Sequence, residues 1–530
     1  MKKILSFLSF LFLTSCQRFT PIVSTSVSNS STEEINSVES SLSTSDSSSV
    51  SLGERDISLF AINDFHGAIK ANGNEAGILK VGSFFKEKGK EENTVIINSG
   101  DMYQGSLLSN ENRGEFLTKV MNNVEFDCFT LGNHEFDWGS EYIDINRAME
   151  DETTHYQTPF LAANIYNYDI ATSTVKDYAN LGEKYVIKTL ENGTKVGIIG
   201  CIGKDQITSI TSSIVDGYTF LDPIAVTKEL SDELRTEKGC EVVVLSLHAD
   251  EDAALNQGLT NVSPISNKKY VDAVFCAHSH QREKAIENGV PFVQASSSGK
   301  AYASVNLHIS ESGDVTCTSY DFPYTSSISV TTDPEIQSIY NSYLNYDTGS
   351  EVIGTLNGNL NQGVTGETVS ILATDSIAWA CNKYASEYSI DYTICNTSRD
   401  SLSNGNITYE ALFKALPFDN DIYIGTCTGR ELANELKYAA FTRLNKSAIV
   451  NKNTYTIAVI DYLGTHRNSS RKYDYFPNFS LKKILKKNGL SYNYREITRD
   501  FIKEEQHLDA SDYSSSLDIH NPDKKYQAIS

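Results

Sequence analysis

Leu131-Gly132-Asn133-His134-Glu135-Phe136-Asp137 is the stretch that decides the fold, because polar residues of metal-binding type follow directly on the apolar run Phe126 to Leu131. A short run of apolar and aromatic residues that ends at a glycine is typical of a buried strand. In α/β sheets, ligands bind beyond the carboxyl ends of the strands. The stretch therefore predicts a strand whose end opens into a site.

Four more apolar runs end in the same way. The segments at their ends are Ile62-Asn63-Asp64-Phe65-His66-Gly67, Asn98-Ser99-Gly100-Asp101, Leu245-Ser246-Leu247-His248 and Cys276-Ala277-His278-Ser279-His280. A lone Asp or His at a strand end is more often a cap or a hydrogen-bonded loop residue, but five such ends in one domain are hard to obtain by accident. Two cations held close together need a bridging anion and a mixture of carboxylate, imidazole and amide ligands, and Asp101 suits the bridge.

The order of the runs predicts an α/β fold with two domains, which is also what a chain of 530 residues has room for. Short β-rich runs alternate with amphipathic stretches from about residue 54 to residue 328, which favours an α/β sandwich. The runs are Ile57 to Asn63, Thr94 to Asn98, Phe126 to Leu131, Lys195 to Gly200, Val242 to Leu247 and Val271 to Cys276.

A connecting segment and a second α/β region follow. Within residues 329–350, the stretch Asp333 to Tyr343 has an acid and a proline in its first turn and apolar residues at helical spacing, so we expect a connecting helix and a hinge there. The second region covers residues 351–490, and we expect residues 491–530 to be a polar, partly disordered tail.

The amino terminus is typical of an exported protein. Lys2 and Lys3 precede the apolar run Ile4 to Leu13, which is too short to span a bilayer, and small residues lead to Cys16. Residues 1–16 resemble a lipoprotein signal with a lipobox, which implies that Cys16 is lipidated; a plain cleaved signal is the alternative. The serine-rich residues 17–53 predict a disordered tether. We therefore expect an extracytoplasmic protein that meets the membrane through its lipid anchor only.

The charge of the chain bears on its partners. A formal net charge of −23 disfavours non-specific attachment to nucleic acid, so we expect no nucleic-acid binding. The nine cysteines form no CxxC pair, and we interpret most of them, such as Cys128, Cys240, Cys276 and Cys395, as small buried apolar residues.

The series DFHG, SGD, GNHEFD, SLHAD and AHSH resembles, in order and spacing, the calcineurin-like metallophosphoesterases, and within them the bacterial 5'-nucleotidase family. The resemblance covers about residues 56–325 and implies a four-layer α/β/β/α sandwich with two divalent ions such as zinc or manganese. It implies the ligands Asp64, His66, Asp101 and His280 for the first ion, and Asp101, Asn133, His248 and His278 for the second. His280 stands where many nucleotidases have glutamine.

In the same family, the pair that matches His134 and Asp137 is a catalytic dyad. The resemblance implies that a hydroxide activated by the metals attacks phosphorus, that His134 stabilises the charge on the leaving side, and that Asp137 orients His134. From the residues alone, Asp137 is also a candidate helix cap before Trp138-Gly139.

The second region resembles the carboxyl-terminal substrate-binding domain of the same nucleotidases from about Val352 to Tyr462. There, Arg399 matches a substrate-contacting arginine and Asn420 a polar contact to the base. Phe418 and Tyr462 match the two aromatics that clamp the base, although both are also candidate core residues. Two glycine-rich turns of the family are missing, which leaves the base and sugar specificity open.

The predicted function is a 5'-nucleotidase-like phosphohydrolase that releases nucleoside and phosphate. Within the same class, a 2',3'-cyclic-nucleotide 2'-phosphodiesterase and a UDP-sugar hydrolase stay open. From a different class, the alternative is a surface binding lipoprotein that has lost the chemistry, which the complete set of ligand residues argues against.

Overall fold

Two six-stranded sheets form the centre of the first domain in the computed structural model. The first sheet has the order β15 (Val315–Asp321), β14 (Ala303–Ile309), β1 (Arg55–Ile62), β2 (Thr94–Asn98), β3 (Cys128–Thr130) and β4 (Phe160–Leu161). The second has the order β12 (Arg282–Glu287), β13 (Val290–Ala295), β11 (Ala273–Phe275), β10 (Val242–His248), β8 (Lys195–Ile202) and β7 (Tyr185–Thr189). β2 and β10 are buried along their whole length, as parallel strands covered on both faces are.

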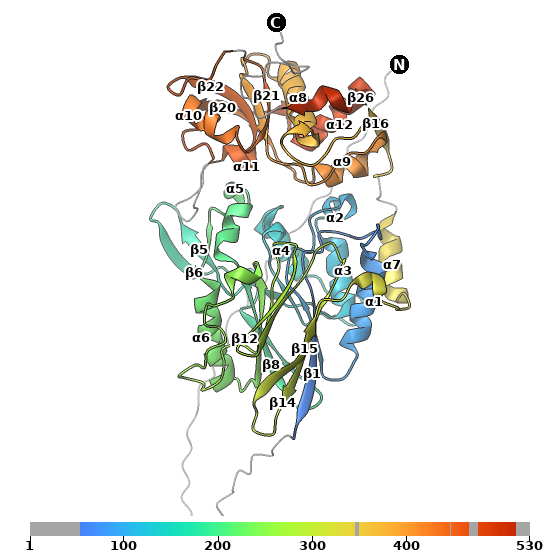
Figure 1. Cartoon of the computed structure of the whole chain (residues 1–530), viewed down its shortest axis with the longest axis vertical. Coiled ribbons are helices and arrows are strands. Elements are labelled where there is room, and N and C mark those ends of the chain that lie inside the picture. Colours follow the sequence, from blue (N-terminus) through green and yellow to red (C-terminus); the bar gives the residue numbers. More distant parts are fainter. Residues whose placement is uncertain (1–52, 345–348, 446, 466–474, 516–530) are drawn as a thin grey trace, which may run out of the picture. The chain divides into compact units, whose positions relative to one another are not determined.

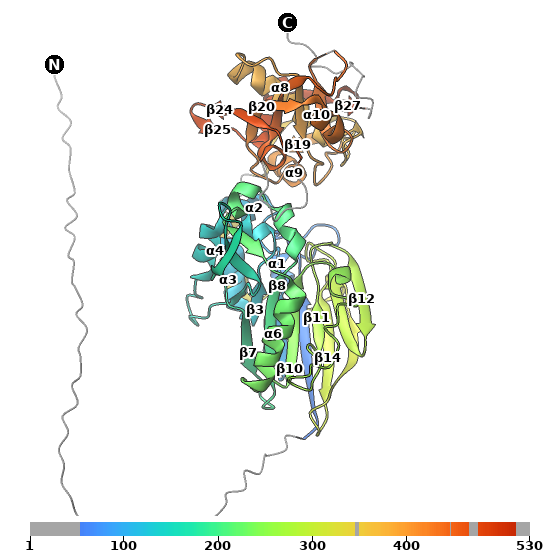
Figure 2. The ribbon, with the colours of Figure 1, turned by 90° about the vertical axis from the view of Figure 1, so that its left-hand side faces the viewer.

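The two sheets pack face to face, and helices cover their outer faces. Leu59, Ile97 and Val244 belong to the apolar core between the sheets. α1 (Gly77–Gly89) and α3 (Glu115–Val124) pack on the first sheet, and α6 (Pro223–Thr236) packs on the second (Figures 1 and 2). The expected α/β/β/α sandwich is therefore confirmed.

The helix expected at Asp333 to Tyr343 is present as α7 (Pro334–Tyr343), and the Asp333 carboxylate caps its first turn by accepting the N–H groups of Glu335 and Ile336. α7 packs against α1 and α3, and Ile336 is fully buried there. The apolar face and the capping residue of this helix are both bound to the first domain, and the hinge expected within residues 329–350 stays a prediction.

The second domain is built on a five-stranded sheet of order β21 (Ala440–Arg443), β18 (Tyr392–Cys395), β22 (Thr454–Ile460), β20 (Ile422–Thr428) and β23 (Ser480–Ile484). The long helix α8 (Val369–Tyr384) packs on this sheet and is buried over most of its length. A three-stranded sheet of order β19 (Gly405–Thr408), β16 (Val352–Asn357) and β26 (His507–Asp509) completes the domain.

Shorter elements connect these parts. They are α2 (Leu107–Glu111), α4 (Ser140–Arg147), β5 (Ile165–Asp169), β6 (Thr174–Tyr178), α5 (Ser212–Val215), β9 (Tyr218–Phe220), β17 (Gly366–Glu367), α9 (Tyr409–Ala415), α10 (Gly429–Glu435), α11 (Asp461–Gly464), β24 (Lys486–Lys487), β25 (Leu490–Ser491) and β27 (Ser514–Ser515).

The polar tail expected from residue 491 is wrong up to residue 515. α12 (Tyr494–Glu505) begins at the capping residue Asn493 and packs against α8, with Ile497 and Phe501 fully buried. β26 then adds a strand beside β16. The stretch is polar in composition, yet its apolar residues recur at helical spacing and supply part of the core of the second domain.

The structure describes residues 53–344, 349–445, 447–465 and 475–515, all within one compact unit, Ser51–Ser530. Cys16 and the tether up to residue 52 lie outside the described residues. In the described part, no helix is both long enough and apolar enough to cross a bilayer. The eight cysteines in these ranges are free thiols, and all but Cys317 are buried, which confirms the interpretation of most cysteines as apolar residues.

Candidate metal centre and active site

The predicted ligand residues converge at the carboxyl ends of β1, β2, β3, β10 and β11. The carboxylate and imidazole ligand atoms form three overlapping groups, and within each group the atoms lie within 4.8 Å of one another. The groups are Asp64, His66 and His280; His66, Asp101 and His134; and Asp101, His248 and His278. His66 and Asp101 each belong to two groups, and of these two side chains only the carboxylate of Asp101 has two oxygens to offer to two cations.

The distances between these side chains are those of a shared coordination site. Nε2 of His66 lies 2.9 Å from Nε2 of His280. Nε2 of His248 lies 3.2 Å from Oδ2 of Asp101. The predicted amide ligand joins the second group, since Oδ1 of Asn133 lies 2.9 Å from Nδ1 of His278.

Two buried atoms of the site have no hydrogen-bond partner in the described part of the chain. They are Oδ2 of Asp101 and Nε2 of His248. An unsatisfied buried carboxylate oxygen costs free energy, and a cation between the two atoms would remove that cost. The residues present therefore fit two divalent ions, and Asp101 and His248 are among the residues that would hold them.

Five of the seven predicted ligands have a left-handed backbone. The φ angles are 48° at Asp64, 49° at His66, 54° at Asp101, 73° at His278 and 60° at His280. A non-glycine residue in this region is uncommon and costs on the order of 1–3 kcal/mol. Such conformations gather at functional sites, where the surrounding structure holds them.

Neighbouring groups hold the ligands in place. The Glu135 carboxylate accepts the N–H groups of Gly132, Asp101 and Met102 at 2.7–2.9 Å, and so ties the loop after β2 to the loop after β3. Gly132 is required in this arrangement, because a Cβ there would lie 2.3 Å from Oδ1 of Asp101. Backbone carbonyl oxygens likewise hold the imidazoles of His66 and His248 in place.

Nδ1 of His66 lies 2.9 Å from the carbonyl oxygen of Gln104, and Nδ1 of His248 lies 2.8 Å from that of Ser99. Each Nδ1 then donates to the carbonyl, so Nε2 is the ring atom that faces the site. Burial opposes a charge on His248, but the Asp101 carboxylate outweighs it and raises the pKa of His248 to about 10, so a cation would displace a proton from this Nε2. These contacts prepare both imidazoles as metal ligands.

Burial sets the charge of two other imidazoles. It lowers the pKa of His278 to about 4, with the neighbouring His248 acting in the same direction, and it lowers the pKa of His280 to about 4. Both rings are therefore neutral at pH 7, which is the form that binds a metal. Burial raises the pKa of Asp64 to about 7, and a cation beside it would favour the ionised form again.

His134 and Asp137 form the predicted pair. Nδ1 of His134 lies 2.8 Å from Oδ2 of Asp137, the residue that follows the short helical turn His134–Phe136. Burial opposes a charge on His134, but the carboxylates of Asp137 and Asp101 outweigh it and raise its pKa to about 9. The Asp137 side chain is thus bound to His134, and the helix-cap interpretation does not describe it.

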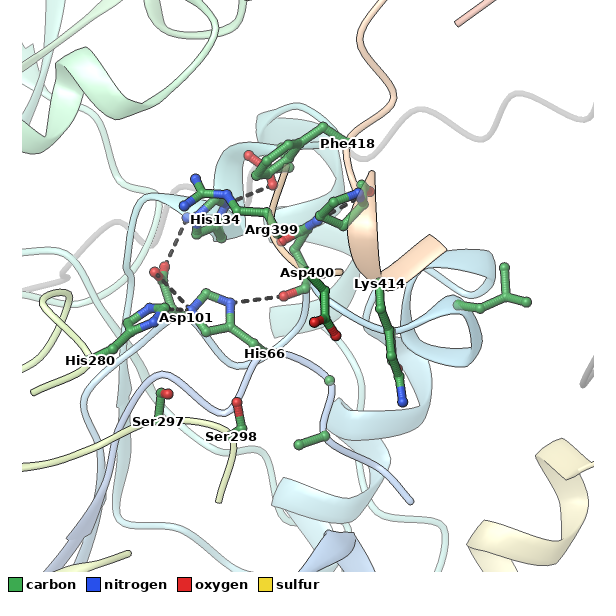
Figure 3. Close-up of a pocket in the computed structure, with 18 of the residues that line it drawn as sticks. His66, Asp101, His134, His280, Ser297, Ser298, Arg399, Asp400, Lys414 and Phe418 are labelled. Atoms are coloured by element: carbon green, nitrogen blue, oxygen red, sulfur yellow. Dashed lines mark hydrogen bonds and ion pairs between the residues drawn. The ribbon is translucent and has the colours of Figure 1, made fainter. Parts of the chain in front are cut away.

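The four predicted substrate-binding residues line one cavity of about 760 Å³ together with the metal centre; they are Arg399, Phe418, Asn420 and Tyr462. The Phe418 ring stacks on His134 at 5.6 Å with an interplanar angle of 18°, and the Arg399 guanidinium lies 5.1 Å from that ring (Figure 3). The Tyr462 ring packs against Tyr475 at 5.8 Å. The clamp of Phe418 and Tyr462 stays a prediction.

Sequence reasoning missed other residues of this cavity. Ser297 and Ser298 from the loop after β13, and Asp400 and Lys414 from the second domain, line it as well (Figure 3). Lys300, from the same loop as the serines, also lines the cavity. Serine and lysine are common on every surface, so the sequence carries no signal that would single these positions out.

Comparisons with known proteins agree with this geometry. Residues 57–282 match the family model of the calcineurin-like phosphoesterases, and residues 352–448 match that of the 5'-nucleotidase C-terminal domain. The cell wall protein Lmo0130 of Listeria monocytogenes is 25% identical over 72% of this chain and 55% of its own length. An apyrase of Tabanus yao is 26% identical over 73% of this chain and 74% of its own length.

The chain thus spans about half the length of the first of these relatives. Among solved structures, the 5'-nucleotidase precursor of Thermus thermophilus has a TM-score of 0.67 at 18% identity, and the match covers 86% of this chain and 97% of that one. That likeness shows the fold. The two family models together cover more than half of the sequence, and the ligand groups lie where the first model matches. The chain belongs to the calcineurin-like metallophosphoesterases of the 5'-nucleotidase family, which use two divalent metal ions.

Proposed function

We propose that the chain is a metal-dependent phosphohydrolase that releases phosphate from nucleotides. The observation that carries the proposal is the position of Asp101. Its carboxylate joins two groups of ligand atoms, and the His134–Asp137 pair lies beside it in a cavity that also receives Arg399. A protein that only binds its ligand has no need for metal-ligating residues, the His134–Asp137 pair and the Arg399 guanidinium in one cavity.

The residues divide the work as follows. When bound, two divalent ions would supply an activated water molecule and neutralise the charge of the phosphate. The residues that would hold the ions are Asp64, His66, Asp101, Asn133, His248, His278 and His280. His134 holds a proton at Nε2 as well as at Nδ1, because the carboxylates of Asp137 and Asp101 raise its pKa to about 9 and keep the ring charged at pH 7. We assign this Nε2 proton to the leaving oxygen. Asp137 fixes the ring and stabilises its charged form.

The second domain supplies contacts for the rest of the substrate. Arg399 offers a guanidinium beside Phe418, so it is placed to bind phosphate oxygens, and Asn420 is a buried amide on the cavity wall. An aromatic slot would accept any base, since every base has a π-face. These contacts support a nucleotide over a small phosphate ester as the substrate.

The proposal includes a place outside the cytoplasm and a lipid anchor at Cys16. It rests on the basic and apolar signal before Cys16 and on the serine-rich segment that follows.

A phosphate-release screen tests the function. The mature chain is incubated with nucleoside mono-, di- and triphosphates, 2',3'-cyclic nucleotides, a UDP-sugar and nitrophenyl phosphate, each with added manganese, zinc, magnesium or calcium. We expect release from nucleotides with at least one metal and loss of release after chelation.

Asp101→Asn serves as the inactive control, because it keeps the shape of the side chain and removes its charge. Preferred turnover of a cyclic nucleotide or a UDP-sugar would mean that the chain has one of these alternative activities of the same class. Binding of nucleotides without any release would make the chain a binding lipoprotein and contradict the proposal.

A further inference from the structure

The loop after β13 presents two hydroxyls to the cavity without using them in the fold. Among the described residues, the side chains of Ser297 and Ser298 have no hydrogen-bond partner. Ser297 is only 8% exposed, and both residues line the cavity. Figure 3 shows both serines on the side of the cavity that carries His66 and His280.

The backbone of this loop is fixed to the first metal ligand. Ser298 donates its N–H to the carbonyl oxygen of Asp64 at 2.7 Å, and the Asn63 amide donates to the carbonyl oxygen of Ser296 at 2.7 Å. Any displacement of the serines relative to Asp64 therefore breaks hydrogen bonds. The hydroxyls are preorganised relative to the metal centre.

The loop also has a costly conformation. Ser296 and Ser298 have φ angles of 62° and 54°. Gly299 has a φ of 63°, and a Cβ there would lie 2.8 Å from the Phe65 ring. A chain that holds two serines in left-handed conformations, and leaves hydroxyls without partners beside a metal centre, has the features of a ligand-binding loop.

The chemistry of the surroundings defines the ligand. The cavity holds imidazoles, the Arg399 guanidinium and the ammonium of Lys300, which is 3.6 Å from Glu75 and too distant for a hydrogen bond with it. Serine hydroxyls donate well to phosphate oxygens, and a bond to a charged acceptor is stronger than one to a neutral acceptor. An anionic phosphoryl group fits this wall.

We propose that the hydroxyls of Ser297 and Ser298 bind the phosphoryl group of the substrate, on the side of the metal centre away from the second domain's Arg399. The inference rests on the proposed function and adds two substrate-binding residues to it. Because the phosphoryl group is common to every phosphate ester, the serines act on all substrates alike. The proposed base clamp, in contrast, acts on nucleotides only.

The test uses Ser297→Ala, Ser298→Ala and the double variant of the metal-loaded mature chain, with Ser312→Ala as the matched control. Ser312 lies on an exposed turn between β14 and β15, and its hydroxyl bonds Asp314. We measure KM for a nucleotide and for nitrophenyl phosphate, the inhibition constant of inorganic phosphate, the bound metal per chain and the thermal unfolding midpoint.

We expect both KM values and the phosphate inhibition constant to rise about tenfold in each single variant and about a hundredfold in the double variant, the factors that a hydrogen bond to a charged group gives. Metal content and the unfolding midpoint should stay as in Ser312→Ala. Ser297→Thr keeps a hydroxyl at a position of negative φ and should retain most of the phosphate affinity, which separates binding from folding.

Three outcomes would overturn the inference. Unchanged phosphate inhibition in the double variant would mean that the hydroxyls face solvent. Loss of metal would mean that the loop only supports Asp64. A rise in KM for the nucleotide alone would place a different part of the substrate at the loop. If the wild type releases no phosphate from any ester, the proposed function fails instead, and inorganic phosphate binding by calorimetry still tests the serines.

Discussion

Lys86 is the residue whose replacement tests how α7 is joined to the first domain. Its Nζ donates to Oδ1 of Asn123 at 2.8 Å, to Oδ1 of Asp333 at 3.0 Å and to Oε2 of Glu335 at 2.6 Å. Asp333 and Glu335 begin α7, while Lys86 and Asn123 belong to α1 and α3. Lys86→Met keeps the length of the side chain and removes these three bonds.

The expected cost follows from burial. The side chains of Lys86 and Asp333 are 10% and 19% exposed, so this bond is worth about 1.5–3 kcal/mol as a hydrogen bond between charged groups. Glu335 is 57% exposed, and its pair contributes at most about 1 kcal/mol. Asp333 keeps its two backbone donors in the variant. We therefore expect Lys86→Met to lose about 2–3 kcal/mol of unfolding free energy.

The loss should depend on pH. The bonds to Lys86, together with backbone donors at Asp333, hold the pKa of Asp333 below its usual value despite burial, and the bond to Lys86 lowers the pKa of Glu335. A carboxyl whose pKa is lowered in the folded state stabilises the protein above its unfolded pKa, and this stabilisation is lost as pH falls through the folded value. The variant and the wild type should thus differ most near pH 7, and the difference should begin to shrink below about pH 4 and vanish only below the lowered pKa values of Asp333 and Glu335.

Urea unfolding at about pH 7 and about pH 3.5, on either side of the usual carboxyl pKa, measures both effects. Lys90→Met is the control, because Lys90 is an exposed lysine just after the same helix. The control should change the free energy of unfolding by less than about 0.5 kcal/mol. An equal loss in Lys90→Met, or a Lys86→Met loss of unchanged size at the acidic pH, would refute the role of the charge cluster. The charge cluster would then not be what holds α7 on the first domain.

Other changes test the site and the anchor. Asp101→Asn should bring bound metal well below two per chain, whereas His134→Gln should keep the metal and lose about 10²–10⁴-fold in turnover; equal metal loss, measured by elemental analysis, would make His134 a ligand. Phe418→Ala or Tyr462→Ala should raise KM for a nucleotide about five- to hundredfold, the effect of about 1–3 kcal/mol of stacking, and leave nitrophenyl phosphate nearly unaffected. Steady-state kinetics on both substrates decides this, and parallel changes would contradict the clamp. Cys16→Ala should release the protein from the membrane fraction or leave it as a precursor, and an unchanged distribution on immunoblots would remove the anchor.

Much of the metal site was predictable because the ligands end apolar strands. β2 ends at Asn98 as expected, and the glycine and aspartate that follow lead directly into the site. Parallel strands bring their carboxyl ends to one edge, so residues as distant as Asp64 and His280 had to approach each other. The strands β3 and β11 are each shorter than the apolar runs that predicted them. The ends of those runs instead form the loops that carry Asn133 and His278.

The parts that the sequence did not reveal depend on contacts rather than on patterns. The polar composition of residues 494–505 predicts a tail, whereas the helical spacing of Tyr494, Ile497 and Phe501 indicates the helix that the structure contains. The binding of α7 by Lys86 is invisible in the sequence, since a lysine in a helix is normally exposed. The same holds for Ser297, which lines a cavity that other strands assemble.

The order of strands in the first sheet determines when the site can form. β1 is paired with β2 on one side and with β14 on the other, in a register that joins Leu59 to Val305. The strand that carries Asp64 is thus incomplete until a segment about 250 residues later has been made. Contacts between segments so far apart in the sequence slow folding.

No early fragment of the chain can hold both ions, because Asp64, His66, Asp101 and Asn133 follow strands of the first sheet, while His248, His278 and His280 follow strands of the second. A nascent chain that stops before β14 has its first sheet open at β1 and exposes a strand edge to other chains. Metal loading therefore comes after the last strands of the sandwich have paired.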